Sequence, residues 1–455
     1  MNYDDFISSK ATGCAPVGFD PQSENNHLMH FQSDIVTWAT RRGRAAIFAD
    51  CGMGKTIMQL SWADNVAAHT GKAVLILAPL AVAQQTVEEG VKFGIAARYL
   101  RADDGNTGIV VTNYEMMDHF ELSRFGGIVL DESSILKSKT GKTRTAIIAA
   151  FQDTPYRLAC TATPAPNDHI ELGNHAAFLG IMSPAEMLAT YFVHDGGSTQ
   201  NWRLKGHARG DFWRWVCSWA IMIQKPSDIG HSDEGFSLPP LVVDQITVNS
   251  DATPGYLFSM VAESMGDRIT ARRESIPQRV RACADVVNST SGQWIVWCGL
   301  NDESKQLSDS INGAVSISGS DPTDLKESRM AGFSRGDFRV LVTKPKICGF
   351  GMNWQHCSNV AFVGLSDSWE SYYQAVRRCW RFGQQSSVNV KIITASTEGA
   401  VVANIQSKEA AAKAMVDGML SEMLDITREN IGGSSRSFIN YNPSLTMEVP
   451  AWLTS

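Results

Sequence analysis

The sequence contains neither a C-x-x-C pair nor a long apolar run. Its nine cysteines are scattered along 455 residues, and His356-Cys357 has no second ligand pair at zinc spacing nearby. We therefore interpret the cysteines as reduced, mostly buried thiols. The longest apolar run, AVLILAPLAVA, is much shorter than a membrane span and is interrupted by Pro79. The start, MNYDDFISSK, is acidic and lacks the apolar segment of a secretory signal, so we expect a cytoplasmic protein without a membrane segment.

An excess of positive charge is also absent. The net charge is -7, with 44% apolar and 19% charged residues, which are ordinary values for a globular protein. This balance argues against a protein coated in basic residues, but a nucleic-acid track can be local, so charge neither excludes nor proves such a partner. The length predicts about three domains at roughly 150 residues each.

A phosphate-binding loop is predicted in AIFADCGMGKTIMQL, residues 46 to 60. RAAIFAD is suited to a buried parallel strand, and the residues after the loop have the apolar spacing of a helix. Gly52 and Gly54 let the backbone wrap around a phosphate, Lys55 adds positive charge, and the Thr56 hydroxyl can bind Mg²⁺. Ala49 stands where the general pattern has glycine.

A second GKT lies in SKTGKTRTAI but lacks a preceding strand. We reject it as a nucleotide site. Two readings of this basic stretch stay open: a solvated loop that leads into the helix TRTAIIAAF, and a contact to a polyanion.

A pair of carboxylates follows the strand in GGIVLDESSILK. Ligands of open α/β sheets bind at the carboxyl ends of strands. Asp131 would therefore hold Mg²⁺ through water, and Glu132 would orient and deprotonate the attacking water.

Further motifs resemble those of the superfamily 2 helicases, closest to the Swi/Snf-type branch of translocases on double-stranded nucleic acid. They are LAPLAVAQQTVEE, VVTNYEMM, CTATPAPN and QAVRRCWRFGQ, in the family's order, and the resemblance covers about residues 26 to 400. It implies a bound ATP with Mg²⁺. The sequence departs from the family at DESS, where a histidine is usual, and in KICGFGMNWQ, where Cys348 replaces a usual glycine. Just before that stretch, Lys344 and Pro345 stand where the family has Ser or Thr.

The resemblance assigns roles to individual residues. Hydrolysis would use Glu132, Lys55, Arg378 and Arg381, because guanidinium groups from a second domain stabilise transition-state charge and make hydrolysis depend on domain closure. The nucleotide would contact Gln32, which can recognise adenine, and Gly52, Met53, Gly54, Lys55, Thr56, Gly351 and Gln374. The metal would be held by Thr56 and Asp131. Coupling falls to Thr161, Thr163 and Asn167. Contacts to nucleic acid fall to Pro79, Thr112, Asn113 and Asn353.

The predicted fold class is α/β, with two tandem RecA-like, doubly wound parallel-sheet domains and a helical insertion between them. The predicted segments are an N-terminal segment 1–25, an ATP-binding domain 26–180, a helical insertion and linker 181–274, a C-terminal helicase domain 275–410, and a helix and tail 411–455. In the second domain we expect strands at QWIVWC, AVSIS, RVLVT, VAFVGL and VNVKIIT.

The predicted insertion mixes tryptophans with basic residues. A stacking surface for nucleic acid is one reading, but Trp213, Trp215 and Trp219 are close enough to pack together, and we favour a small core. A second basic run is formed by Arg268, Arg272, Arg273, Arg279 and Arg281, with Asp267 and Glu274 as candidate ion-pair partners. For that run we favour a solvated helix face over direct binding.

The leading functional prediction is an ATP-driven motor that steps along nucleic acid, with double-stranded DNA as the expected track. True strand separation is a rival within the enzymes. A nucleotide-gated binding or assembly switch, controlled by a protein partner, is a rival from another class. A separate partner such as a nuclease or a replication or recombination factor is also conceivable.

Overall fold

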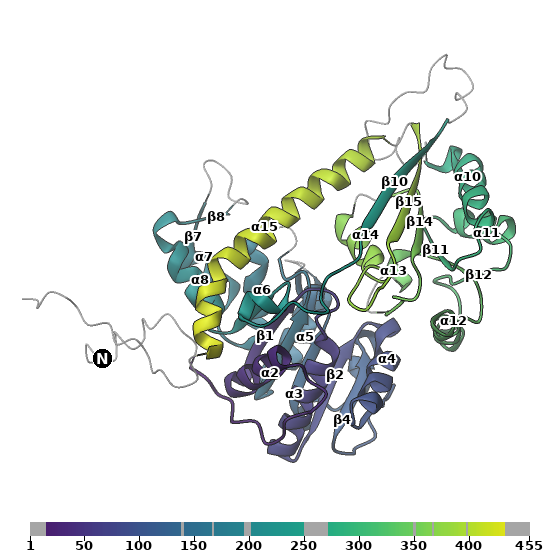
Figure 1. Cartoon of the computed structure of the whole chain (residues 1–455). Coiled ribbons are helices and arrows are strands. Elements are labelled where there is room, and N and C mark those ends of the chain that lie inside the picture. The colour runs from purple at the N-terminus through teal and green to yellow at the C-terminus, as the bar shows by residue number, and fades with distance from the viewer. Residues whose placement is uncertain are drawn as a thin grey trace, which may run out of the picture.

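Two parallel β-sheets, each covered by helices on both faces, form two lobes (Figure 1). This architecture confirms the predicted fold class. The computed structural model describes residues 15–137, 141–165, 168–194, 202–249, 272–348, 352–365, 368–396 and 399–432. Within these ranges, no helix is both long and apolar enough to span a membrane.

The first sheet has the strand order β3-β4-β2-β5-β6-β1-β9, and all its neighbouring strands pair in parallel. Its strands are β1 (Arg44–Ala49), β2 (Ala73–Ala78), β3 (Ala97–Tyr99), β4 (Ile109–Asn113), β5 (Phe125–Asp131), β6 (Tyr156–Thr161) and β9 (Ala220–Ile223). Alternate residues of β1 enter different cores: Ala46 and Phe48 pack on one face, and Ala45 and Ile47 pack on the other. The near-continuous apolar runs of these strands reflect burial on both faces.

Helices cover both faces of this sheet (Figure 1). They are α2 (His30–Arg42), α3 (Lys55–Thr70), α4 (Leu80–Lys92), α5 (Lys142–Ala150), α6 (Leu172–Leu179), α7 (Pro184–Tyr191) and α8 (Arg209–Cys217). Local sequence sets several of their ends. Ser183 and Glu186 form a capping box at the start of α7, and Gly71 ends α3 in a left-handed conformation.

The segment predicted as an insertion contributes to both sheets. After the hairpin β7 (Phe192–His194) and β8 (Trp202–Leu204), strand β9 pairs with β1, and β10 (Leu241–Val248) pairs with β15 of the second lobe. The strand β9 is only four residues long, and such a short apolar run does not by itself distinguish strand from helix. The first sheet therefore extends beyond residue 180, where the sequence analysis ended the first domain.

Tryptophans of this segment are core residues. Trp213, Trp215 and Trp219 are at most 3% exposed, and Trp215 and Trp219 meet edge to face with ring centroids 5.4 Å apart. The core interpretation is confirmed for these three side chains.

The second sheet has the order β10-β15-β14-β11-β13-β12 and is also parallel throughout. The five predicted strands are confirmed as β11 (Trp294–Cys298), β12 (Ala314–Ser316), β13 (Val340–Thr343), β14 (Asn359–Val363) and β15 (Val388–Ala395). The helices of this lobe are α10 (Ile276–Asn288), α11 (Asn301–Ser310), α12 (Thr323–Arg335), α13 (Pro345–Cys348) and α14 (Trp369–Val376).

A buried ion pair lies between α10 and α11. The Arg279 guanidinium donates to the Glu303 carboxylate at 2.8 Å, and both side chains are fully buried. Arg272 also pairs with Glu303, at 3.3 Å. Backbone N–H groups of Gly299 and Leu300 complete the shell of Glu303. The expectation of a solvated basic face is therefore wrong for Arg272 and Arg279, because their charges are used inside the lobe.

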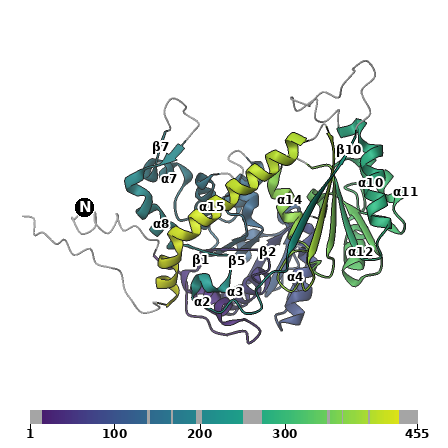
Figure 2. The ribbon, with the colours of Figure 1, turned by 45° about the horizontal axis from the view of Figure 1, so that its top comes forward.

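The last described helix, α15 (Gly399–Gly432), spans both lobes (Figures 1 and 2). Near its start, Val401, Val402 and Ile405 belong to a core of the second lobe. Further along, Met419 and Met423 enter a core of the first lobe. The helix therefore connects the two lobes.

We expect the Glu303→Ala variant to lose about 3–5 kcal/mol of unfolding free energy, because Arg279 would be left as an uncompensated buried charge. Urea unfolding followed by tryptophan fluorescence measures this loss. Glu422→Ala is the matched control, since Glu422 pairs with Arg209 at the surface and should contribute less than about 1 kcal/mol. Equal losses in the two variants would contradict the prediction.

Candidate active site between the two lobes

The predicted phosphate loop connects β1 to α3. Gly52 and Gly54 have φ angles of 92° and 80°, which favour glycine. A Cβ at Gly54 would lie 2.3 Å from Nε2 of Gln32, so a side chain has no room there. The Lys55 ammonium donates to the carbonyl oxygens of Ala49 at 2.8 Å and Asp50 at 3.4 Å. The loop thus presents backbone and one cation at the amino end of α3, an arrangement suited to an anion.

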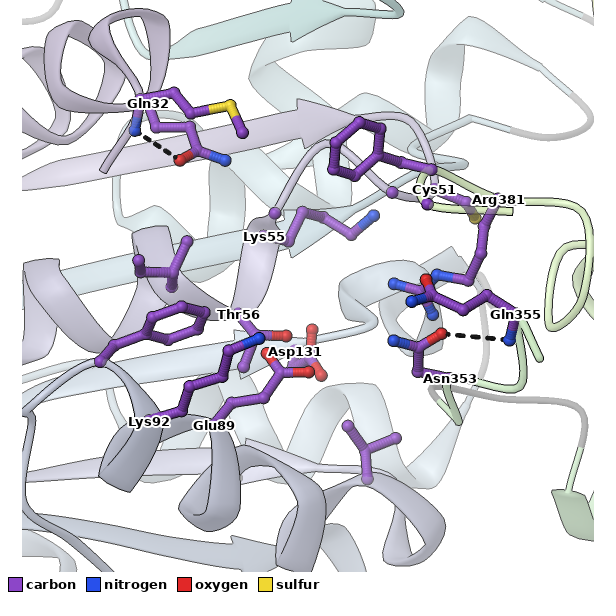
Figure 3. Close-up of a pocket in the computed structure, with 18 of the residues that line it drawn as sticks. Gln32, Cys51, Lys55, Thr56, Glu89, Lys92, Asp131, Asn353, Gln355 and Arg381 are labelled. Carbon is purple, nitrogen blue, oxygen red and sulfur yellow. Dashed lines mark hydrogen bonds between the residues drawn. The ribbon is translucent and has the colours of Figure 1, made fainter. Parts of the chain in front are cut away.

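A cavity of about 350 Å³ opens at this loop and is lined from both lobes, a volume within the usual range for ligand sites. Figure 3 shows Lys55, Thr56 and Asp131 across the cavity from Asn353 and Arg381. Of the predicted site residues, the cavity is lined by Gln32, Gly52, Gly54, Lys55, Thr56, Asp131, Glu132, Asn353, Arg378 and Arg381.

The two predicted carboxylates lie in different environments. Asp131 ends β5, and its Oδ1 accepts from Nε2 of Gln59 at 2.7 Å. Burial, followed by the neighbouring charge of Glu132, raises the pKa of Asp131. Glu132 has a φ of 52°, the only positive value of a non-glycine residue in the described ranges. Its Oε2 is buried and has no hydrogen-bond partner in that part of the chain. Such strain at a site is typical of functional residues.

The two predicted arginines follow α14. Arg378 is 2% exposed and donates to the Gln374 side chain and backbone at 2.8 Å each. Arg378 and Arg381 both approach the carbonyl oxygen of Met352 at 3.4 Å. Gln374, predicted to contact the nucleotide, is fully buried and does not line the cavity. In this structure its amide holds Arg378.

Gln32 combines two local roles with its place in the cavity. Its Oε1 accepts from the Met29 N–H at 3.0 Å (Figure 3). Its Nε2 donates to the Met53 carbonyl at 3.0 Å. An amide has a second donor and a second lone pair, so Gln32 keeps capacity for an adenine edge. The Met53 side chain, by contrast, belongs to the core.

The remaining predicted residues are dispersed. Thr161 and Thr163 are buried after β6, where the Thr163 N–H donates to Thr161 Oγ1 at 3.1 Å. Thr112 and Asn113, predicted for nucleic acid, are also buried at the end of β4. Pro79 is half-buried and precedes α4. Asn353 lies in the cavity itself. Gly351 and Asn167 lie outside the described residues.

Sequence reasoning missed several residues at the interface of the lobes. Asp50 of the loop contacts Tyr373 and Arg377 from α14 and its end. Phe236 stacks on Phe382 with ring centroids 4.4 Å apart, and both line the cavity. Arg377 stands beside Arg378 in the sequence, but nothing in the motif spacing singled it out.

His175 on α6 lies against the acidic motif. Its Nε2 is 3.2 Å from Oγ of Ser133, and the ring meets Phe48 edge to face. Burial lowers the pKa of His175 to about 4, so the imidazole is neutral at physiological pH. The sequence has DESS where related sequences carry a histidine, and the fold thus brings a histidine from another element to this motif.

The residues present fit a nucleotide with Mg²⁺. Within the described ranges, no group of three His, Cys, Asp or Glu side chains could hold a metal alone. Thr56 and Asp131 both line the cavity. Mg²⁺ is commonly bound through one or two protein ligands together with substrate phosphates and water, and this donor set suits that mode.

Fold and cavity together define the class of two-lobed, helicase-type ATPases. The family "Type III restriction enzyme, res subunit" matches residues 23–166, and "Helicase conserved C-terminal domain" matches residues 278–383. The first match covers the phosphate loop and the acidic motif, and the second covers the two arginines.

The mouse (Mus musculus) protein "DNA annealing helicase and endonuclease ZRANB3" is 22% identical in an alignment of 424 residues that covers 83% of this chain. The chain spans 39% of the length of that relative. A solved structure, "Sulfolobus solfataricus SWI2/SNF2 ATPase core in complex with dsDNA", is 16% identical with a TM-score of 0.41, covering 91% of this chain and 98% of that one. By these two family matches and the mouse relative, the chain is similar to the superfamily 2 helicases of the Snf2-like branch, a group of nucleic-acid-dependent ATPases.

His175 should make folding stability depend on pH. The unfolded chain takes up a proton near pH 6.5, but the folded chain does so only near pH 4. Stability should therefore fall as pH drops from about 6.5 to 4, by on the order of 3 kcal/mol, and this contribution is constant above about pH 7. We expect His175→Gln to flatten the acid side of the stability profile in urea unfolding. The exposed His119→Gln variant should not, and identical profiles would contradict the assignment.

Proposed function

We propose that this chain is an ATP-driven motor that steps along nucleic acid, with double-stranded DNA as its track. The observation that supports the proposal is the single cavity lined by the phosphate loop of one lobe and by Arg378 and Arg381 of the other. A site divided in this way makes hydrolysis depend on closure of the lobes. Repeated closure and opening converts hydrolysis into movement.

Each side chain has a chemical role in this proposal. Lys55 and the loop N–H groups bind the phosphates, and Thr56 and Asp131 hold Mg²⁺, which neutralises phosphate charge. Glu132 orients the attacking water and accepts its proton, consistent with a carboxylate oxygen left without a protein partner. Arg378 and Arg381 stabilise the charge that develops on the transferred phosphoryl group.

The two family matches and the mouse relative support double-stranded DNA as the track. That relative is described as a DNA annealing helicase and endonuclease, and the motifs of this chain resemble those of the double-stranded branch. Translocation on duplex DNA is therefore favoured over strand separation.

We expect steady-state ATP hydrolysis to rise at least tenfold on addition of duplex DNA, with less effect from single-stranded DNA or RNA. The Lys55→Ala variant is the blank, because it removes the cation from the loop. Hydrolysis that ignores every nucleic acid would overturn the motor and point to a switch controlled by a protein partner.

We also expect the Glu132→Gln variant to bind ATP normally but to lose roughly 10²–10⁴-fold in kcat, the usual contribution of a general base. Arg381→Ala should likewise keep binding and lose hydrolysis. Equilibrium titration with a fluorescent ATP analogue, beside single-turnover hydrolysis, separates the two effects. Turnover of Glu132→Gln at the parent rate would show that another group is the base.

A further inference from the structure

Asp50 connects the phosphate loop to the second lobe. Its Oδ2 accepts from Nη2 of Arg377 at 2.6 Å, and its Oδ1 accepts from the Tyr373 hydroxyl at 2.8 Å. The same Oδ1 accepts from the Cys51 N–H at 2.6 Å. Arg377 Nη2 also donates to the Cys51 carbonyl at 3.0 Å. Asp50 thus holds the backbone of the loop and two side chains of the other lobe together.

The pair is shielded unevenly from water. The Arg377 side chain is 4% exposed and the Asp50 side chain 25% exposed. The guanidinium also lies 5.7 Å and 5.1 Å from the ring centroids of Tyr373 and Trp380. Burial by itself lowers the pKa of Arg377, but the Asp50 carboxylate raises it overall. The guanidinium is therefore charged, and because it is buried its attraction to the carboxylate is screened less than that of a surface pair.

Position in the chain ties this contact to the two site arginines. Arg377 immediately precedes Arg378, and Phe382 follows Arg381. A Cβ at Gly52 would lie 2.8 Å from both the backbone N and the Cβ of Phe382. The stretch 377–382 is therefore held against the loop at two points, one on each side of the arginines that line the cavity.

We propose that Asp50, Tyr373 and Arg377 form an inter-lobe clamp that sets the position of Arg378 and Arg381 relative to the phosphate loop. This inference rests on the proposed function, because it assigns the clamp to the closed, hydrolysing state. Arg377 is then a positioning residue: it does not line the cavity and acts through its neighbours and through the loop.

The inter-lobe ion pair between Arg101 and Asp324 differs in kind. Arg101 reaches Asp324 across the cleft at 2.7 Å, but these side chains are 49% and 84% exposed. An exposed pair contributes at most about 1 kcal/mol, and neither residue touches the loop. Arg101→Met is therefore a matched control that removes an inter-lobe pair without touching the clamp.

The first test is a double-mutant cycle on DNA-stimulated ATP hydrolysis with Asp50→Asn, Arg377→Met and the double variant. Each single change should lower kcat about tenfold, and the double variant should lose no more than either, because both changes remove one interaction. The KM for ATP should stay within about threefold, since the phosphate contacts of the first lobe are intact. Tyr373→Phe should lose about threefold, and Arg101→Met nothing.

A role confined to stability gives a different result. It predicts a lower melting temperature with unchanged kcat in the variants that remain folded. Additive losses, about 100-fold in the double variant, would also overturn the clamp, as would parent rates in Asp50→Asn, the isosteric change least expected to impair folding.

A second measurement does not depend on hydrolysis. The eight described cysteines are buried, so spin labels can be placed at Glu115→Cys in the first lobe and Asp309→Cys in the second, with Cys14 replaced by Ser. Without nucleotide, we expect a narrow distance distribution in the parent and Arg101→Met, and a longer, broader one in Asp50→Asn and Arg377→Met. Unchanged distance distributions would overturn the clamp. If the distributions change as expected but the parent protein does not hydrolyse ATP, the clamp stands and the motor is refuted instead.

Discussion

Parallel pairing of β1, β6 and β5 is the constraint on which the site depends. Because neighbouring strands run in the same direction, their carboxyl ends reach one edge of the sheet. The phosphate loop after β1 and Asp131 at the end of β5 therefore meet there, although more than seventy residues separate them. The Gln59–Asp131 hydrogen bond fixes the helix that follows the loop to the acidic strand. Every further contact of the cavity is made against this edge.

The second lobe completes the site by bringing cations to that edge. Arg378 is oriented by Gln374 beneath it, and Asp50 receives Arg377 at the side of the loop. Helix α15 limits how far the lobes can separate, because its two ends are buried in different lobes. In the proposed motor, short-range charge pairing at the loop would hold the lobes closed, and α15 would connect them throughout.

The acidic motif shows how a local departure in sequence is accommodated by the fold. DESS carries small hydroxyl side chains after Glu132, and the space is filled by His175 and by the edge of the core around Phe48. The neutral imidazole of His175 contacts Ser133, the residue after Glu132, whose φ is positive. Helix α6 follows β6 in the chain, where Thr161 ends β6 and Thr163 lies between this strand and the helix.

The local sequence determined the elements and most of the cavity. The strand-loop-helix pattern and the acidic pair, together with the motifs that carry the family resemblance, predicted ten residues that the cavity brings together, because each motif lies within one element or at its end. Tertiary structure decided the rest. The short strand β9 joins the first sheet only because β1 offers an open edge. Arg279 is buried, and Arg272 partly buried, because Glu303 lies opposite, and Arg377 pairs with Asp50 only when the lobes meet. Such pairings join residues far apart in the chain, and no local period encodes them.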